Sequence, residues 1–228
     1  MAKLIKELVV GGLIKLSTID YPDMLSAVVF CQGCPWRCSY CHNQELLPVT
    51  GNEHINWHEI IEFLKQRKGL LDAVVFSGGE PTLQPGLVSA IQQVRALGFK
   101  IGLHSAGYSP RLLHSILSLI DWIGLDIKTV PADYPRLTGA LNSGWQAWES
   151  AVLVIESGVY YEIRITAHPA LLDVPTLEST IRQLRNIGAR NIVVQECRTN
   201  IHLDWVGTKN KDMTIYANTL HSNNIILR

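Results

Sequence analysis

Four cysteines lie within eleven residues of the chain: Cys31, Cys34, Cys38 and Cys41. Thiolates this close on one loop can converge on one metal centre, whereas a secreted disulfide framework spreads its cysteines along the chain. Two CxxC pairs could bind zinc, although zinc sites usually separate their pairs by about a dozen residues or more. All four could hold a ferredoxin-type cluster, although the bacterial ferredoxin run is spaced differently.

A third interpretation uses only Cys34, Cys38 and Cys41, in a CxxxCxxC spacing, to hold a [4Fe–4S] cluster. Three thiolates leave one iron without a protein ligand, and an open metal position is typical of a catalytic site. Under this interpretation Cys31 and the isolated Cys197 are expected to be small buried hydrophobes.

The segment Ser77-Gly78-Gly79-Glu80-Pro81 follows a predicted strand. Two glycines would let the polar head of a ligand approach the backbone closely, and Glu80 could accept a hydrogen bond from an ammonium group. The alternative is a plain turn, since a Gly-Gly pair alone carries little information.

Polar side chains also alternate along two later strands. Asp126 and Lys128 lie two residues apart and should share one face, either as a ligand site or as a structural ion pair. Glu162, Arg164 and Thr166 alternate with apolar residues. This pattern favours a ligand-lined interior, with the exposed face of an edge strand as the alternative.

The string FCQGCPWRCSYCHN, residues 30–43, resembles the cluster loop of radical S-adenosylmethionine (SAM) enzymes, in particular the glycyl-radical-enzyme activases. Upstream, GGLIKLSTIDYPDMLSAVVF is similar to the opening of the longer anaerobic ribonucleoside-triphosphate reductase activating proteins. The likeness covers roughly residues 11–195 and is strongest in the first third of the chain. It implies that Cys34, Cys38 and Cys41 ligate a [4Fe–4S] cluster and that SAM chelates the fourth iron.

The same resemblance implies where SAM lies. Tyr40, or backbone beside it, would lie against the adenine, and the Gly-Gly-Glu segment would hold the methionyl amino group. The expected SAM contacts are Tyr40, Gly78, Gly79, Glu80, Asp126, Lys128, Arg164 and Thr166. At residues 104–107 the chain has His-Ser-Ala-Gly where many members have Thr-Asn-Gly, so this loop lacks the usual amide.

By resemblance, the reduced cluster cleaves SAM to methionine and a 5′-deoxyadenosyl radical, which takes a hydrogen atom from a glycine of a partner enzyme. The first partner expected is an anaerobic ribonucleotide reductase, with a flavodoxin- or ferredoxin-like electron donor. Two alternatives are a pyruvate formate-lyase-type activating enzyme and a radical SAM enzyme acting on a small molecule. From another class, the chain could be a zinc- or cluster-binding structural or electron-transfer protein.

These residues need a scaffold that brings strand ends together. Apolar runs that alternate with helical patterns predict strands over 26–31, 73–76, 99–104, 122–127, 161–166 and 191–195. Helices are expected over 56–65, 87–97, 111–119, 145–157, 176–187 and 211–221. The alternation predicts an α/β fold with a parallel sheet, either open or curled. The resemblance implies the curled form, a partial (β/α)6 radical SAM barrel with outer helices, and function is expected at the carboxyl ends of its strands.

The 228 residues, 47% of them hydrophobic, suit one domain. We expect a cluster loop over 32–48, a barrel over about 24–197 and a tail over 198–228. The formal net charge is zero, with acids and bases interspersed, which argues against nucleic acid or an anionic membrane as a partner. The amino-terminal apolar segment is broken by charges and resembles neither a signal peptide nor a membrane span. A cytoplasmic location is therefore expected.

Overall fold

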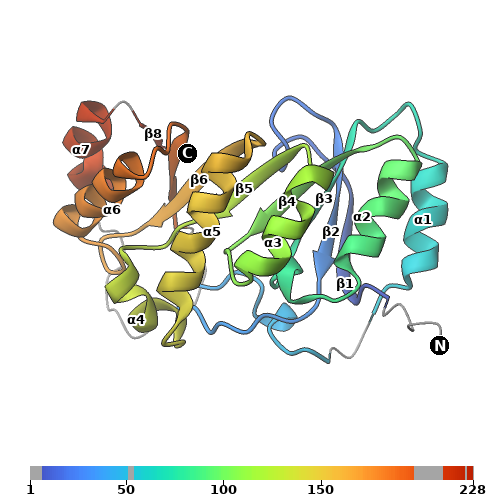
Figure 1. Ribbon diagram of the computed structural model, residues 1–228, viewed down its shortest axis with the longest axis horizontal. Helices are drawn as coiled ribbons and strands as arrows, with labels where there is room; N and C mark the ends of the chain where they lie inside the picture. Colours follow the sequence, from blue (N-terminus) through green and yellow to red (C-terminus); the bar gives the residue numbers. More distant parts are fainter. Residues whose placement is uncertain (1–6, 51–53, 198–212, 224, 228) are drawn as a thin grey trace.

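One curved sheet organises the molecule (Figure 1). The computed structural model describes residues 7–50, 54–197, 213–223 and 225–227. Eight strands follow one another in chain order: β1 (Val10–Ser17), β2 (Ser26–Cys31), β3 (Ala73–Gly78), β4 (Lys100–Ser105), β5 (Trp122–Asp126), β6 (Tyr160–Ala167), β7 (Ile192–Glu196) and β8 (Ile226–Leu227). β1 runs antiparallel to β2, and every other neighbouring pair is parallel.

The six predicted strands are confirmed as β2 to β7. The edge strands β1 and β8 were not predicted. In β1, Gly11 and Gly12 interrupt the apolar pattern, and the strand is stabilised by pairing with β2 rather than by a local signal. β8 has two residues and pairs only with β7, so no periodicity can reveal it.

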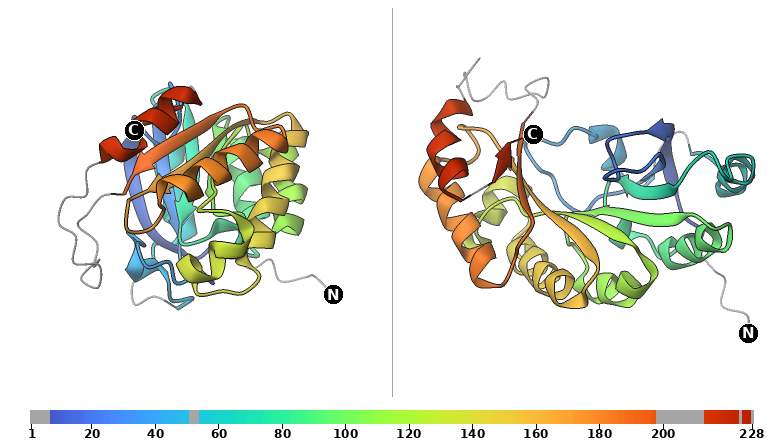
Figure 2. Two further views of the ribbon diagram at one scale, coloured as in Figure 1. Left: turned by 90° about the vertical axis from the view of Figure 1, so that its left-hand side faces the viewer. Right: turned by 90° about the horizontal axis from the view of Figure 1, so that it is seen from above.

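Helices cover the outer face of the sheet, as Figure 2 shows from above. They are α1 (Trp57–Lys65), α2 (Leu87–Ala96), α3 (Pro110–Ile116), α4 (Tyr134–Thr138), α5 (Ser143–Ser157), α6 (Val174–Asn186) and α7 (Ala217–Ser222). Short 3-10 helices span Gln44–Leu46, Pro81–Leu83, Leu117–Leu119, Pro131–Asp133 and Met213–Tyr216. In the described ranges no helix is long and apolar enough to cross a membrane.

Local signals explain where several helices begin. The side chain of Asn56 accepts a hydrogen bond from the amide of His58 at 2.8 Å, which confirms the predicted start of α1. Asp173 caps α6 in the same way, through the amide of Thr176. The short α4 was not predicted. The predicted helix over 211–221 is replaced by the 3-10 turn and α7, and its first two residues lie outside the described ranges.

The curvature gives the sheet an outer and an inner face. Ala27, Val29 and Cys31 of β2 belong to the core between sheet and helices, whereas Val28 and Phe30 face the interior. β1 and β8 do not pair, so the sheet is a partial barrel, as expected.

The amino end of the barrel is closed by the segment between β1 and β2. Tyr21 packs against Trp122 with ring centroids 5.2 Å apart, and a Cβ added at Gly102 would lie 2.9 Å from the Tyr21 ring. The backbone carbonyl of Asp20 accepts a hydrogen bond from His104 Nε2 at 2.9 Å. The TIDYP sequence therefore plugs the end of the barrel opposite to the cysteine loop, because that loop follows the carboxyl end of β2.

Candidate active site

The cysteine loop leaves β2 and folds back on itself. The amide of Gly33 donates to Leu46 O at 2.8 Å, and the amide of Cys34 donates to Leu47 O at 3.1 Å. A tight turn between them brings the amide of Cys41 to Cys38 O at 3.1 Å. Cys34, Cys38 and Cys41 are thus held on one compact loop, and all three side chains are partly exposed.

Residues that the sequence analysis did not single out hold this loop in place. The side-chain amide of Gln32 donates to Glu45 O and Pro48 O, at 3.1 and 2.8 Å. The amide of Arg37 donates to Thr138 O at the end of α4, at 2.8 Å. The third support is Trp36, which is 2% exposed and packs edge-on against Tyr108 and Tyr134, with ring centroids 6.4 and 6.1 Å away. A large aromatic residue inside the cysteine loop was the sequence signal that could have indicated it.

The two remaining cysteines are core residues. Cys31 is fully buried on the helix-covered side of β2, and Cys197 is 1% exposed. Among the described residues no three His, Cys, Asp or Glu side chains converge closely enough to hold one metal ion. In a [4Fe–4S] cluster each thiolate binds a different iron, so its cysteines need not meet at one point.

Burial affects the state of the thiols. It raises the pKa of Cys34 to about 12, opposed by an amide hydrogen bond and by the charge of Lys128. It also raises the pKa of Cys41, with Lys128 again opposing. The thiols of Cys34 and Cys41 are therefore protonated without a metal, and binding iron must release their protons.

The Gly-Gly pair joins β3 to the cysteine loop. A Cβ at Gly79 would lie 2.3 Å from Gly33 O, and one at Gly78 would lie 2.5 Å from the amide of Cys31. Backbone atoms of β2 and of the cysteine loop thus occupy the space beside these glycines, so this space is not open to a ligand. The amide of Gly79 also donates to Cys31 O at 2.8 Å. These glycines position the cysteines, and their contact with SAM stays a prediction.

Glu80 is 1% exposed and its carboxylate accepts four hydrogen bonds from the protein, three at Oε1 and one at Oε2. It accepts hydrogen bonds from the amide and hydroxyl of Thr82, the hydroxyl of Ser105 and the amide of Ala106, at 2.6 to 3.0 Å. Burial raises its pKa, while these hydrogen bonds oppose the shift. Glu80 therefore joins the ends of β3 and β4. In the loop at residues 104–107, the hydroxyl of Ser105 and the amide of Ala106 both donate to its carboxylate.

Tyr40, a residue of the cysteine loop, comes together with Asp126 and Lys128. Lys128 Nζ lies 5.3 Å from the centroid of the Tyr40 ring, and both residues are buried. Burial lowers the pKa of Lys128, but Tyr40, Cys38 and Asp126 outweigh this effect, so the pKa lies well above its ordinary value. Lys128 is therefore an ammonium ion at neutral pH. The expectation that Asp126 and Lys128 act at one place agrees with their mutual electrostatic interaction.

The polar face of β6 lines the interior. β6 lies between β5 and β7, so the edge-strand alternative is wrong. Arg164 points back toward the amino end of the barrel: its guanidinium lies 5.0 Å from the Trp122 ring centroid and covers Gly124, where a Cβ would meet Cζ at 2.6 Å. Thr166 lies two residues nearer to the mouth. The guanidinium of Arg164 is therefore directed away from the mouth of the barrel.

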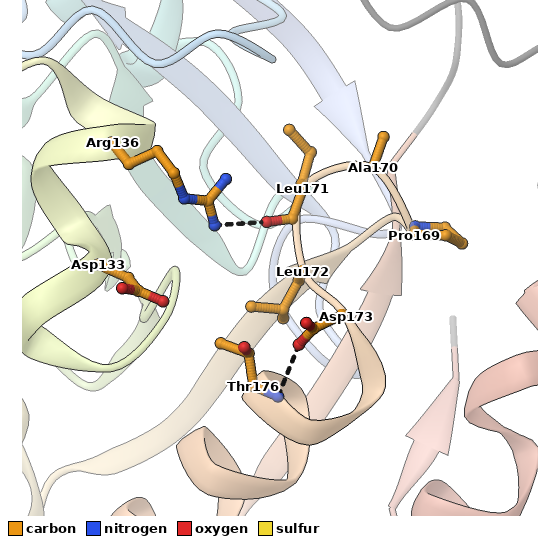
Figure 3. A pocket seen from close by; sticks show the side chains of 8 residues that line it. All are labelled: Asp133, Arg136, Pro169, Ala170, Leu171, Leu172, Asp173 and Thr176. Atoms are coloured by element: carbon orange, nitrogen blue, oxygen red, sulfur yellow. Dashed lines mark hydrogen bonds between the residues drawn. The ribbon is translucent and has the colours of Figure 1, made fainter.

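A cavity of about 370 Å³ opens at the carboxyl end of the sheet, between α4 and the β6–α6 loop (Figure 3). Arg136 donates to Leu171 O at 2.9 Å across it, and Asp133 and Asp173 add carboxylates to its wall. A second cavity of similar volume lies at the opposite end, next to Tyr21 and Tyr160.

Comparison with known proteins identifies the family. The model of the radical SAM superfamily matches residues 28–184. The chain belongs to the radical SAM superfamily. A Methanocaldococcus jannaschii protein named "Putative glycyl-radical enzyme activating enzyme" is 30% identical over 187 residues, which are 78% of this chain and 75% of that protein. The pyruvate formate-lyase-activating enzyme of Clostridium pasteurianum is 34% identical over 182 residues, 75% of each chain.

Solved structures agree on the fold. Streptococcus suis SuiB bound to its precursor peptide SuiA superposes with a TM-score of 0.62 at 16% identity, over 88% of this chain and 48% of SuiB. The chain thus spans about half the length of SuiB, and at this identity only the fold is shared. SuiB has also been solved with SAM bound.

A [4Fe–4S] cluster and SAM are the cofactors of this radical SAM enzyme. The residues around the cysteines fit them. The Tyr40 hydroxyl is buried, and among the described residues only Lys128 offers it a hydrogen bond. Buried polar groups in native proteins are nearly always satisfied, so this hydroxyl and the ammonium beside it fit a polar ligand.

Proposed function

We propose that this radical SAM enzyme is an activase that generates a glycyl radical on a partner protein. The observation that carries the proposal is the arrangement at the carboxyl end of the sheet. The three-cysteine loop meets Lys128 and Asp126 through its own Tyr40, in a chain 30 to 34% identical to enzymes named as activating enzymes.

Each group has a task in this proposal. Cys34, Cys38 and Cys41 hold the cluster and leave one iron for the amino and carboxylate groups of SAM. Lys128 and Asp126 supply a cation and an anion beside the cysteines, and Thr166 lies on the same inner wall. Gly78, Gly79 and Glu80 fix the loop that they touch. When bound, the cofactors supply the one-electron cleavage that starts radical chemistry.

The floor of the barrel would exclude water from that chemistry. Tyr21, His104 and Trp122 form a continuous packed layer at the amino end. Within the described ranges, a partner would then approach from the mouth, where the cavity beside α4 leaves room for one of its loops. A flavodoxin- or ferredoxin-like protein would supply the electron.

A formate-lyase-type partner is the first candidate, because the relative named for that activity is 34% identical. An anaerobic ribonucleotide reductase is the second, supported by the sequence resemblance of the opening segment. That support is weaker than the sequence suggests, because the TIDYP residues lie at the end of the barrel remote from the cysteines. In this chain the TIDYP residues pack in the floor of the barrel and not at its mouth.

The proposal is tested without oxygen, using cluster-loaded protein, SAM and a chemical reductant. Each candidate partner is added separately and examined by electron paramagnetic resonance. We expect a glycyl radical signal on one partner, and none when Cys34→Ala replaces the native protein. SAM cleavage without a radical on either partner would contradict the activase assignment and favour a small-molecule substrate.

A further inference from the structure

Lys128 is locked to the cysteine loop from two sides. Its side chain is buried against the ring of Tyr40, which lies between Cys38 and Cys41 in sequence. Its backbone amide donates to the hydroxyl of Tyr134 at 2.9 Å. The Tyr134 ring packs in turn on Trp36, which lies between Cys34 and Cys38.

This cation acts electrostatically on the cysteines. Its charge lowers the pKa of Cys34 and of Cys41, against the larger opposing effect of burial, and so favours negative charge on these sulfurs. Carboxylates oppose it: Glu80 acts on Cys34, and Glu45 acts on Cys41. Glu45 is exposed, so water and salt screen it more strongly than the buried ammonium.

We propose that Lys128 tunes the reduction potential of the cluster, in addition to any contact with SAM. The inference rests on the proposed ligation by Cys34, Cys38 and Cys41. Reduction adds one negative charge to the cluster. A fixed cation in a poorly screened position stabilises the reduced form more than the oxidised form and raises the potential. Asp126, which interacts with Lys128, opposes this effect.

The experiment is a redox titration of the cluster-loaded protein without SAM, followed by electron paramagnetic resonance. Because SAM and the partner are omitted, this test does not depend on the activase proposal. That proposal can fail while the effect of Lys128 on the reduction potential is still observed. Lys128→Met should shift the midpoint potential to more negative values, and Lys128→Arg should restore it toward the native value. Lys65→Met is the matched control, because Lys65 is half-exposed on α1, pairs with Glu62 and should leave the potential unchanged.

Removing the opposing charge gives an independent arm. Asp126→Asn should shift the potential in the positive direction, and it keeps the tuning testable if Lys128→Met does not retain a cluster. An unchanged midpoint potential in Lys128→Met overturns the proposal. If Lys128→Met cannot be obtained with a cluster, an unchanged midpoint potential in Asp126→Asn overturns it. Loss of SAM affinity in Lys128→Met at an unchanged potential would make Lys128 a SAM contact only.

Discussion

Arg164 donates from Nε to Glu162 Oε1 on its own strand, at 3.0 Å, although Asp126 is its direct neighbour across the β5–β6 register. In the described part of the chain no ion pair joins Arg164 to Asp126. Glu162 and the Trp122 ring together hold the guanidinium in the interior, and Gly124 leaves the space for it. This arrangement leaves the carboxylate of Asp126 available at the mouth of the barrel.

The first prediction concerns this pair. Glu162→Gln should lower the free energy of unfolding by roughly 3 kcal/mol, because it leaves a guanidinium only 11% exposed without its counter-charge. Urea unfolding followed by circular dichroism measures the loss. The double variant Glu162→Gln with Arg164→Met removes both charges and should recover part of it. Equal stability of Glu162→Gln and the native protein would contradict the structural role of the pair.

Asp126 and Glu80 should respond differently to removal of the carboxylate. Asp126→Ala is expected to weaken SAM binding by roughly tenfold to a hundredfold, the loss of one charge-assisted hydrogen bond of about 1.5–3 kcal/mol, with little change in stability. Glu80→Ala leaves several buried donors without an acceptor, so it should lower SAM affinity and stability together. Calorimetric titration with SAM and urea unfolding distinguish the two outcomes, and intact SAM affinity in Asp126→Ala would make that residue structural.

Cluster retention should separate the five cysteines. Alanine at Cys34, Cys38 or Cys41 should abolish binding of about four irons per chain, because a three-thiolate site cannot lose a ligand. Cys31→Ser and Cys197→Ser should keep the iron, since both thiols are buried in the core. Iron and sulfide analysis of anaerobically purified protein is the measurement. Complete iron loss in Cys31→Ser would restore the four-cysteine interpretation.

Gly79→Ala should impair the cluster without removing any ligand. Its Cβ would lie 2.3 Å from Gly33 O, so the cysteine loop must move away from β3. The control is Gly98→Ala: Gly98 has φ +96° and open space around its Cβ position. The control costs about 1–2 kcal/mol of backbone strain, yet its iron content should stay native. Iron per chain is measured in both, and equal retention would show that the loop tolerates the displacement.

Stability should depend on pH through His104. Burial, together with the charge of Arg164, lowers its pKa from 6.5 to about 3. Between these values the unfolded chain binds more protons than the folded one, so stability falls as the pH falls below about 6.5, by at most about 1.4 kcal/mol per pH unit. Urea unfolding at two pH values measures this. His104→Gln should show a flatter dependence, and an identical slope would assign the effect to other groups.

The tautomer of His104 follows from its partners. Asp20 O can only accept, so Nε2 carries the proton and donates to it at 2.9 Å. Nδ1 then accepts from the hydroxyl of Ser77 at 3.2 Å. This neutral ring connects β3, β4 and the floor segment, which the sequence pattern of residues 104–107 did not indicate.

The sequence by itself determined the chemistry and the order of the elements. The spacing of Cys34, Cys38 and Cys41 is a local property of one loop. The apolar runs of β2, β3 and β5 are largely buried on both faces, so this signal also lies within a few neighbouring residues. The start of α1 is equally local, because Asn56 bonds to an amide two residues away.

Only the tertiary structure decided what the companion residues touch. Glu80 is satisfied by Ser105 and Ala106, which are 25 and 26 residues away. The side chain of Arg164 turns back to Glu162 on the same strand. The alternation on β6 cannot indicate this, because alternation shows on which face a side chain lies and not in which direction along the strand it points. The plug made by Tyr21 depends on Trp122, about a hundred residues later in the sequence, and contacts of that separation exist only after the sheet has curved.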